Sequence, residues 1–259
     1  MKRLLSAFAV SFCLSAILPA QNAAPTHAPD FQAPFLIAPL YFPPKVNAPF
    51  MAIARTLVVR RMSDGSTQTS ENQRVIARDM EGRIFQERRT FVPVPDPDNR
   101  QSLVRIDEYS DPVAHTVYRC NPYAKVCGLF SYFPRVESPE RPAGVQPGGH
   151  SYLTRQSLGA DVMDGQEVLH TRETFTVYAE TAGNTKNIIR TVDFWYSPQL
   201  GVNVREERHD PRDGDQTLWL TDLTSSAPDP AVFQVPSGYR IIDHRNPQPQ
   251  AQTQPDRTP

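Results

Sequence analysis

The sequence has little of three features that would narrow its function: cysteine, an excess of one charge, and catalytic motifs. Its 259 residues include only 3 cysteines, and 27 basic against 28 acidic side chains leave a net charge of −1. That balance argues against nucleic-acid binding, which would need clustered, unbalanced Lys and Arg. Gly-x-Ser-x-Gly, His-Glu-x-x-His and a glycine-rich phosphate loop do not occur in the sequence. The sequence therefore predicts no catalytic residue and no cofactor.

Long apolar runs are also missing after the N-terminus. The N-terminal apolar run, residues 4–18, follows Lys2 and Arg3 and precedes the small residue Ala20. This order is typical of a secretory signal peptide, and the run is too short to span a membrane. Cys13 lies inside the apolar run, which excludes its acylation as a lipoprotein cysteine. We expect cleavage after Ala20 or a few residues later, and a periplasmic or secreted protein with no transmembrane segment in the mature chain.

Removal of the signal peptide leaves two cysteines, Cys120 and Cys127, in an oxidising compartment. If residues 122–125 form a four-residue hairpin loop, Asn121 pairs with Val126 and the two cysteines face each other. We therefore predict a disulfide across the hairpin. The competing interpretation is a redox or metal-binding pair, but six intervening residues do not fit the Cys-x-x-Cys spacing of either.

Short runs of β-type residues fill the sequence between residues 50 and 243. About ten of them alternate apolar with polar side chains, and turn residues separate them. The best helix candidate is a single turn at Pro230–Phe233, where Asp229 is placed to cap it. No strand–helix–strand spacing appears, so the sheet should be antiparallel. We predict a mainly β protein: one strongly curved antiparallel sheet that forms a half-open barrel, with little helix.

Pairing is most clearly readable in the segment 188–243. Its turns at 197–201 and 210–214 separate three strands, which should form an antiparallel meander. Apolar side chains on one side of the three strands make a continuous surface, which we predict to bind ligand: Val192, Phe194, Tyr196, Val202, Val204, Leu218 and Leu220. Charged positions such as Glu206, Glu207 and Arg208 are expected on a solvated, paired sheet face.

Four ionisable residues crowd the second turn of this meander: His209, Asp210, Asp213 and Asp215. A calcium-binding loop would need oxygen-bearing side chains at the positions of Pro211 and His209. The residues are typical of a tight turn, and no metal site is predicted.

Composition divides the chain into four parts. Residues 21–49 are rich in proline and also strongly apolar, so we expect part of this arm to lie against the domain or a partner. The predicted parts are a signal peptide (1–20), a Pro-rich N-terminal arm (21–49), the antiparallel β domain (50–243) and a disordered C-terminal tail (244–259). Within the domain, residues 134–149 form a long loop.

Two resemblances rest on particular residues. The C-terminal half resembles the periplasmic lipoprotein-carrier superfamily of the LolA/LolB type, to which the RseB type is related, through Trp195, Pro198, Leu200, Asp210, Gly214, Leu218, Leu220, Pro228, Phe233, Pro236 and Gly238. The stretch from Arg55 to Asp243 resembles an uncharacterised secreted bacterial family through Asp64-Gly65, Arg78-Asp79, Gly82-Arg83, Glu87, Asp111-Pro112, Tyr118, Leu158-Gly159, Asp164-Gly165, Arg172 and Gly183-Asn184. The first resemblance implies a carrier fold and a lipid or lipoprotein ligand.

Three hypotheses for function follow, each from a different class. The first is an exported, non-enzymatic binding protein that holds an acyl chain, a lipid or a lipidated protein on the concave face of a half barrel. The second is an envelope scaffold with a filled core, which engages a partner through the N-terminal arm or the loop at 134–149. The third is a hydrolase whose site has no recognisable motif.

Overall fold

The computed structural model describes residues 42–95, 105–135 and 140–245. The predicted signal peptide, most of the Pro-rich arm and most of the C-terminal tail lie outside these ranges. Among the described residues, no helix is both long and apolar enough to cross a membrane.

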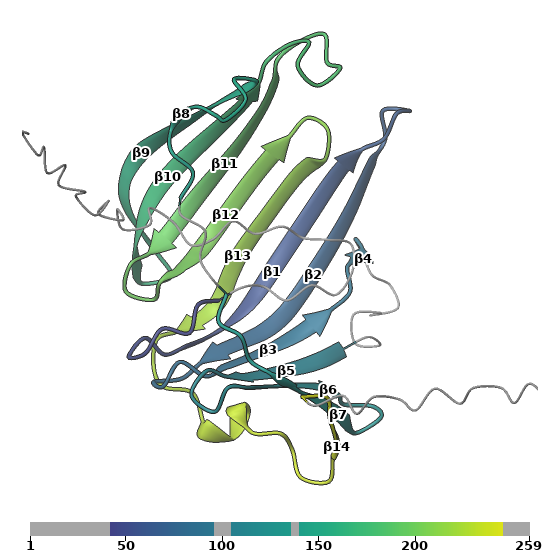
Figure 1. Ribbon diagram of the computed structural model, residues 1–259, viewed down its shortest axis with the longest axis vertical. Helices are drawn as coiled ribbons and strands as arrows, with labels where there is room; N and C mark the ends of the chain where they lie inside the picture. The colour runs from purple at the N-terminus through teal and green to yellow at the C-terminus, as the bar shows by residue number, and fades with distance from the viewer. Residues whose placement is uncertain (1–41, 96–104, 136–139, 246–259) are drawn as a thin grey trace, which may run out of the picture.

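The described chain folds as one open sheet (Figure 1). The strands follow the spatial order β14-β7-β6-β5-β3-β2-β1-β13-β12-β11-β10-β9-β8, with β4 paired beside β2. Their bounds are β1 (Phe50–Arg61), β2 (Thr67–Arg78), β3 (Ile84–Arg89), β4 (Val92–Pro93), β5 (Arg105–Asp111), β6 (Thr116–Asn121), β7 (Val126–Ser131), β8 (Gly144–Val145), β9 (Ser151–Met163), β10 (Gln166–Val177), β11 (Ile188–Ser197), β12 (Val202–Asp210), β13 (Gly214–Thr224) and β14 (Arg240–Asp243). The predicted mainly β, curved sheet is confirmed.

One pair of strands is parallel, which corrects the expectation of a purely antiparallel sheet. β14 runs parallel to β7, with Arg240 beside Val126 and Asp243 beside Leu129. The chain reaches this position through a long excursion after β13, which contains the 3₁₀ helix η2 (Pro230–Phe233). The segment between β13 and β14 is long enough to carry the chain to the edge of the sheet at β7, where β14 runs parallel to β7. Parallel neighbours need such a long connection, and here it contains a 3₁₀ helix in place of an α-helix.

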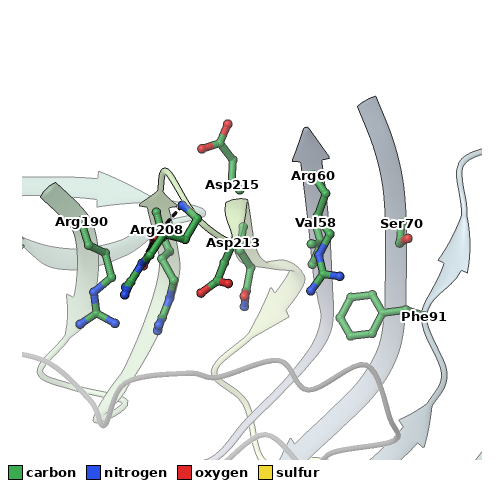
Figure 2. A pocket seen from close by; sticks show the side chains of 12 residues that line it. Val58, Arg60, Ser70, Phe91, Arg190, Arg208, Asp213 and Asp215 are labelled. Atoms are coloured by element: carbon green, nitrogen blue, oxygen red, sulfur yellow. Dashed lines mark hydrogen bonds and ion pairs between the residues drawn. The ribbon is translucent and has the colours of Figure 1, made fainter. Parts of the chain in front are cut away.

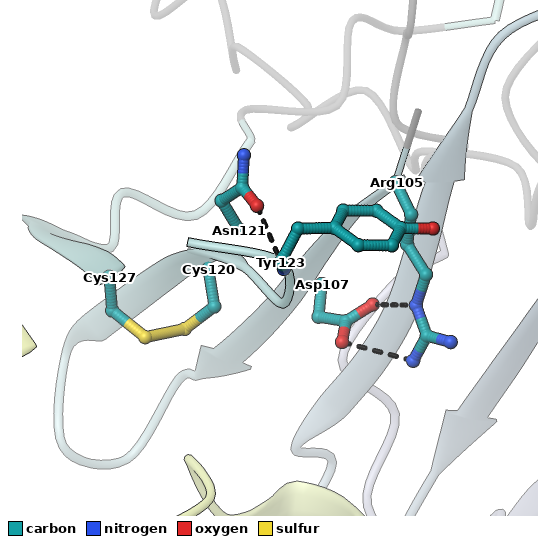
Figure 3. Close-up of a disulfide and its surroundings, with 6 residues drawn as sticks. All are labelled: Arg105, Asp107, Cys120, Asn121, Tyr123 and Cys127. Carbon is teal, nitrogen blue, oxygen red and sulfur yellow. Dashed lines mark hydrogen bonds and ion pairs between the residues drawn. A yellow bond between two sulfur atoms is a disulfide. The ribbon is translucent and has the colours of Figure 1, made fainter. Parts of the chain in front are cut away.

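The cysteine hairpin has the predicted register. Asn121 pairs with Val126 and Cys120 with Cys127, and the two cysteines form a disulfide (Figure 3). In the loop, the side-chain oxygen of Asn121 accepts hydrogen bonds from the backbone N–H groups of Tyr123 and Ala124, both at 3.0 Å. The asparagine thus closes the turn with its own side chain, as is common for this residue.

Two apolar clusters lie on opposite faces of the sheet, because neighbouring residues on a strand point to opposite sides. Ile76 belongs to the larger cluster, together with Phe42, Phe50, Leu218 and others. Ala77 belongs to the smaller one, which contains the disulfide and is covered by Val232 and Phe233 of η2. The 3₁₀ helix is capped as predicted: the Asp229 carboxylate accepts from the N–H of Ala231 at 2.9 Å.

The described end of the Pro-rich arm, residues 42–49, packs against the domain as expected. Phe42 is buried in the larger cluster, and its ring centroid lies 5.9 Å from that of Phe50. The last residues of the arm therefore belong to the folded core.

Candidate functional site

The strand register determines which residues share a face around the predicted ligand surface. Directly paired residues point to the same side of a sheet. Phe194 pairs with Glu206, which pairs with Leu218, which pairs with Thr56 of β1. We call this side of β10–β13, β1 and β2 the Phe194 face, and the opposite side the Trp195 face.

A bulge changes the simple alternation that the sequence predicts for β12. Trp195 pairs with Arg205, whereas the next residue, Tyr196, pairs with Asn203, so Val204 is the extra residue on β12. A bulge of this kind bends its strand and increases the local twist.

The seven predicted ligand-binding residues are almost all buried. Phe194 has 0% and Val192 2% of its surface exposed, and Tyr196 is half-buried. The other four belong to the larger apolar cluster: Val202, Val204, Leu218 and Leu220. The structure thus buries six of the seven side chains, on β11, β12 and β13, and places four of the six in one cluster. Ligand binding by them stays a prediction.

Charged side chains lie among these apolar ones, which corrects the expectation of a solvated face at Glu206 and Arg208. Glu206 is 2% exposed, and its carboxylate lies 3.4 Å from the guanidinium of Arg208 and 3.3 Å from the side-chain amide of Asn203. The physical reason is the strand period: residues 206 and 208 share the face of Phe194 and Val192, and Glu207 points the other way. Glu207 pairs there with Arg205 at 2.7 Å.

A buried arginine on β2 adds positive charge to the Phe194 face. Arg74 is 3% exposed and pairs with Ala54 on the Phe194 face. Burial, with a contribution from the nearby Arg88, lowers the pKa of Arg74 to about 10. It remains charged at neutral pH, so the inner part of this face carries positive charge that the sequence pattern does not reveal.

An open pocket of about 370 Å³ lies at one end of the Phe194 face (Figure 2). Arginines from β11, β12, β1 and the β12–β13 turn line it, together with three aspartates of that turn and the apolar Phe91. The lining residues are Val58, Arg60, Ser70, Phe91, Arg190, Arg208, Asp210, Arg212, Asp213, Gly214, Asp215 and Gln216.

Two of the crowded ionisable residues at the turn are hydrogen-bonded to neighbouring side chains. The Asp210 carboxylate accepts from Arg212 at 3.0 Å (Nε) and 2.7 Å (Nη2), and Asp215 pairs with the His209 ring. The hydrogen bond from the Arg212 side chain lowers the pKa of Asp210, and the charge of nearby Arg190 adds to that effect. Turn chemistry thus accounts for this cluster.

On the Trp195 face, His170 and Arg205 both lie against the ring of Trp195. The His170 ring stacks on Trp195 with centroids 4.2 Å apart, and the guanidinium of Arg205 lies 5.5 Å from the Trp195 ring centroid. Arg205 also pairs with Trp219, so it stands between the two tryptophans. The two tryptophans are therefore not on adjacent strands.

The fold defines a mainly β protein built on a single open, curved sheet. No protein-family model and no curated protein matches the chain. Solved structures that it is similar to include MucB (TM-score 0.38, 9% identity, covering 76% of this chain and 60% of MucB) and an uncharacterized conserved protein from Thermus thermophilus (TM-score 0.37, 8% identity, 76% and 90%). A LolA superfamily protein from Nitrosomonas europaea also matches (TM-score 0.26, 9% identity, 72% and 90%). The chain thus spans about three fifths of MucB.

Proposed function

We propose that this chain is an exported binding protein without enzymatic activity. Its ligand is hydrophobic, an acyl chain, a lipid or a lipidated protein, and lies on the concave side of the sheet, the Phe194 face. The observation that supports this most directly is the continuity of that face. Val192 pairs with Arg208, which pairs with Gln216, which pairs with Val58, so the apolar residues adjoin the open pocket across neighbouring strands.

Apolar burial gives this face enough free energy for a useful affinity. Each buried methylene contributes about 0.8 kcal/mol. An acyl chain of modest length therefore reaches roughly micromolar affinity after the ordering of chain and side chains is subtracted. An acyl chain entering from the pocket first meets Val58 and Phe91.

Binding of a fluorescent fatty acid to the mature protein tests the proposal. Val58→Asp places a charge in the pocket and should weaken binding about tenfold or more, whereas Leu158→Asp on β9 is a matched control outside the pocket. Phe194→Asp tests the buried part of the face. A folded Val58→Asp protein that binds as tightly as wild type would exclude this entry, and an unfolded Phe194→Asp protein would favour the filled-core scaffold.

A second candidate function, protein–protein interaction in the envelope, is favoured by the edge of β9. The two-residue strand β8 pairs only with Leu153 and Tyr152, although β9 is 13 residues long. Beyond them, Leu158 and Val162 are exposed on the edge strand. Such an edge accepts an added strand from a partner. A photocrosslinker at Val162 that gives a discrete adduct in a periplasmic extract, with none at Arg240, would favour this function.

A further inference from the structure

We infer that the pocket at the end of the Phe194 face binds an oxyanion, a phosphate or carboxylate group. This goes beyond the proposed function, because a hydrophobic ligand alone gives no reason for a pocket lined with arginines. The inference rests on where the strand register gathers the cations.

Three arginines from three different strands point to one side of the sheet at one end. Val192, Arg208 and Val58 share a face through direct pairing, with Gln216 between the last two. Arg190 precedes Val192 by two residues and Arg60 follows Val58 by two, so both lie on that face as well. All three arginines line the same pocket, and Figure 2 shows their side chains extending in the same direction.

Acidic side chains accompany these arginines in and beside the pocket. Four arginines and three aspartates line the pocket, since Arg212 is the fourth. The Asp210 carboxylate accepts two side-chain hydrogen bonds from Arg212, and the Asp215 carboxylate is hydrogen-bonded to the His209 ring. Glu206 lies under the pocket lining, 3.4 Å from Arg208. The remaining lining carboxylate, Asp213, sits on the exposed turn. A guanidinium has five N–H donors, so an arginine that already contacts one partner can also donate to an anion in the pocket.

The chemistry of the lining suits an oxyanion. A guanidinium presents planar N–H groups that match the oxygen spacing of carboxylate and phosphate. Ser70 and Gln216 supply neutral donors between the arginines. The pocket volume of about 370 Å³ lies within the usual range for small-molecule sites, and Val58 and Phe91 add apolar surface. The pocket thus fits an anionic group that is attached to a larger molecule, and it also admits a free anion.

Calorimetric titration of the mature chain with three probes separates these cases. Inorganic phosphate tests the free anion, laurate tests a carboxylate on an acyl chain, and methyl laurate has the same chain without the charge. The variant Arg60→Gln/Arg190→Gln removes two cations and keeps the Arg208–Glu206 pair. The control Arg61→Gln/Arg240→Gln removes the same charge from exposed positions, the neighbouring residue on β1 and the far edge strand.

We expect the affinity for laurate, for phosphate or for both to fall about tenfold or more in Arg60→Gln/Arg190→Gln. The affinity for methyl laurate should not change, and the control should bind like wild type. Binding of phosphate alone assigns a free anion, and binding of laurate without phosphate assigns the headgroup of an acyl ligand. Rising salt should weaken wild-type binding of the anionic probes, which tests the inference even if the double variant fails to fold.

Two outcomes would overturn the inference. One is that neither phosphate nor laurate binds to the wild type. The other is that laurate binds as methyl laurate does, with no effect of salt or of the two arginines. Methyl laurate separately reports on the hydrophobic ligand, so the failure of the anion site and the failure of the proposed function are distinguishable.

Discussion

The guanidinium of Arg78 donates a hydrogen bond to the backbone oxygen of Leu200, although 122 residues separate them in the sequence. The same group donates to the carbonyl oxygens of Ala48 at 2.9 Å and Pro43 at 2.8 Å. Arg78 is fully buried, and burial lowers its pKa to about 10, so it is charged at neutral pH. The Arg78 side chain on β2 is therefore hydrogen-bonded both to the segment before β1 and to the turn between β11 and β12.

Replacement of Arg78 by Met should cost about 3 kcal/mol or more in the free energy of unfolding. It removes three hydrogen bonds from a charged donor and leaves buried carbonyl oxygens without that donor. Urea denaturation followed by tryptophan fluorescence measures the change, and Arg61→Met, at an exposed position of β1, should stay within about 0.5 kcal/mol of wild type. A loss below about 1 kcal/mol for Arg78→Met would contradict this role.

Gly214 at the start of β13 should tolerate no side chain. Its φ is +92°, and a Cβ would lie 2.2 Å from the backbone oxygen of Val59 on the neighbouring strand. Gly214→Ala therefore adds a backbone clash to the cost of a left-handed conformation, which is about 1 kcal/mol. The matched control is Gly165→Ala, since Gly165 has φ +75° and a Cβ there would meet nothing within 4 Å. Thermal unfolding should show a loss several times larger at Gly214, and equal losses would rule out the close approach.

The sequence predicts local pairings well where turn residues and alternation agree. β1 begins at Phe50, where the predicted β domain begins, and the disulfide hairpin and η2 have the predicted residues. β2 begins at Thr67. The alternation in the sequence predicts a start at Gln73, because the polar first half of the strand is held by pairing with β1 and carries no apolar signal. The sequence pattern does not predict the parallel strand β14, because β14 pairs with β7, which is far from it in the sequence.

For the candidate site as well, the sequence predicts the residues that lie close together in the chain and not those that distant strands bring together. The apolar residues of the Phe194 face are readable from period-2 alternation within one segment. The arginine pocket is not, because Arg60 and Arg190 are far apart in the sequence and come to line one pocket only through the pairing of β1 with β13, of β13 with β12 and of β12 with β11. Glu206 and Arg208 resemble ordinary surface charges in the sequence, and only their place beside Phe194 and Val192 makes Glu206 buried and Arg208 half-buried.

Loss of the disulfide should lower stability by about 2–3 kcal/mol, the loop-closure value for a short loop. Cys120→Ala/Cys127→Ala is the suitable variant, because both cysteines have 0% exposure and alanine leaves no buried hydroxyl. Urea denaturation of the variant and the wild type gives the difference. Intact-mass analysis after alkylation shows whether the exported protein carries the bond, and two alkylated thiols in unreduced protein would contradict the pairing.

Asp210 should make the free energy of unfolding depend on pH in the acid range. The Arg212 side chain holds the pKa of Asp210 below its usual 3.8 in the folded chain. The unfolded state therefore takes up a proton first as pH falls. The contribution of Asp210 is complete above pH 3.8 and is lost as pH falls through the folded-state pKa.

Comparison with Asp210→Asn isolates this contribution. At neutral pH the variant should be less stable than wild type by about 1 kcal/mol, because a hydrogen-bonded carboxylate has been replaced by an amide. The difference should shrink as pH is lowered below 3.8, and Arg212→Gln should reduce the pH dependence because it removes the main cause of the lowered pKa. Urea midpoints at a series of pH values provide the measurement. A wild-type and Asp210→Asn difference that stays constant from neutral pH to the acid limit would show that the ion pair with Arg212 does not stabilise the fold.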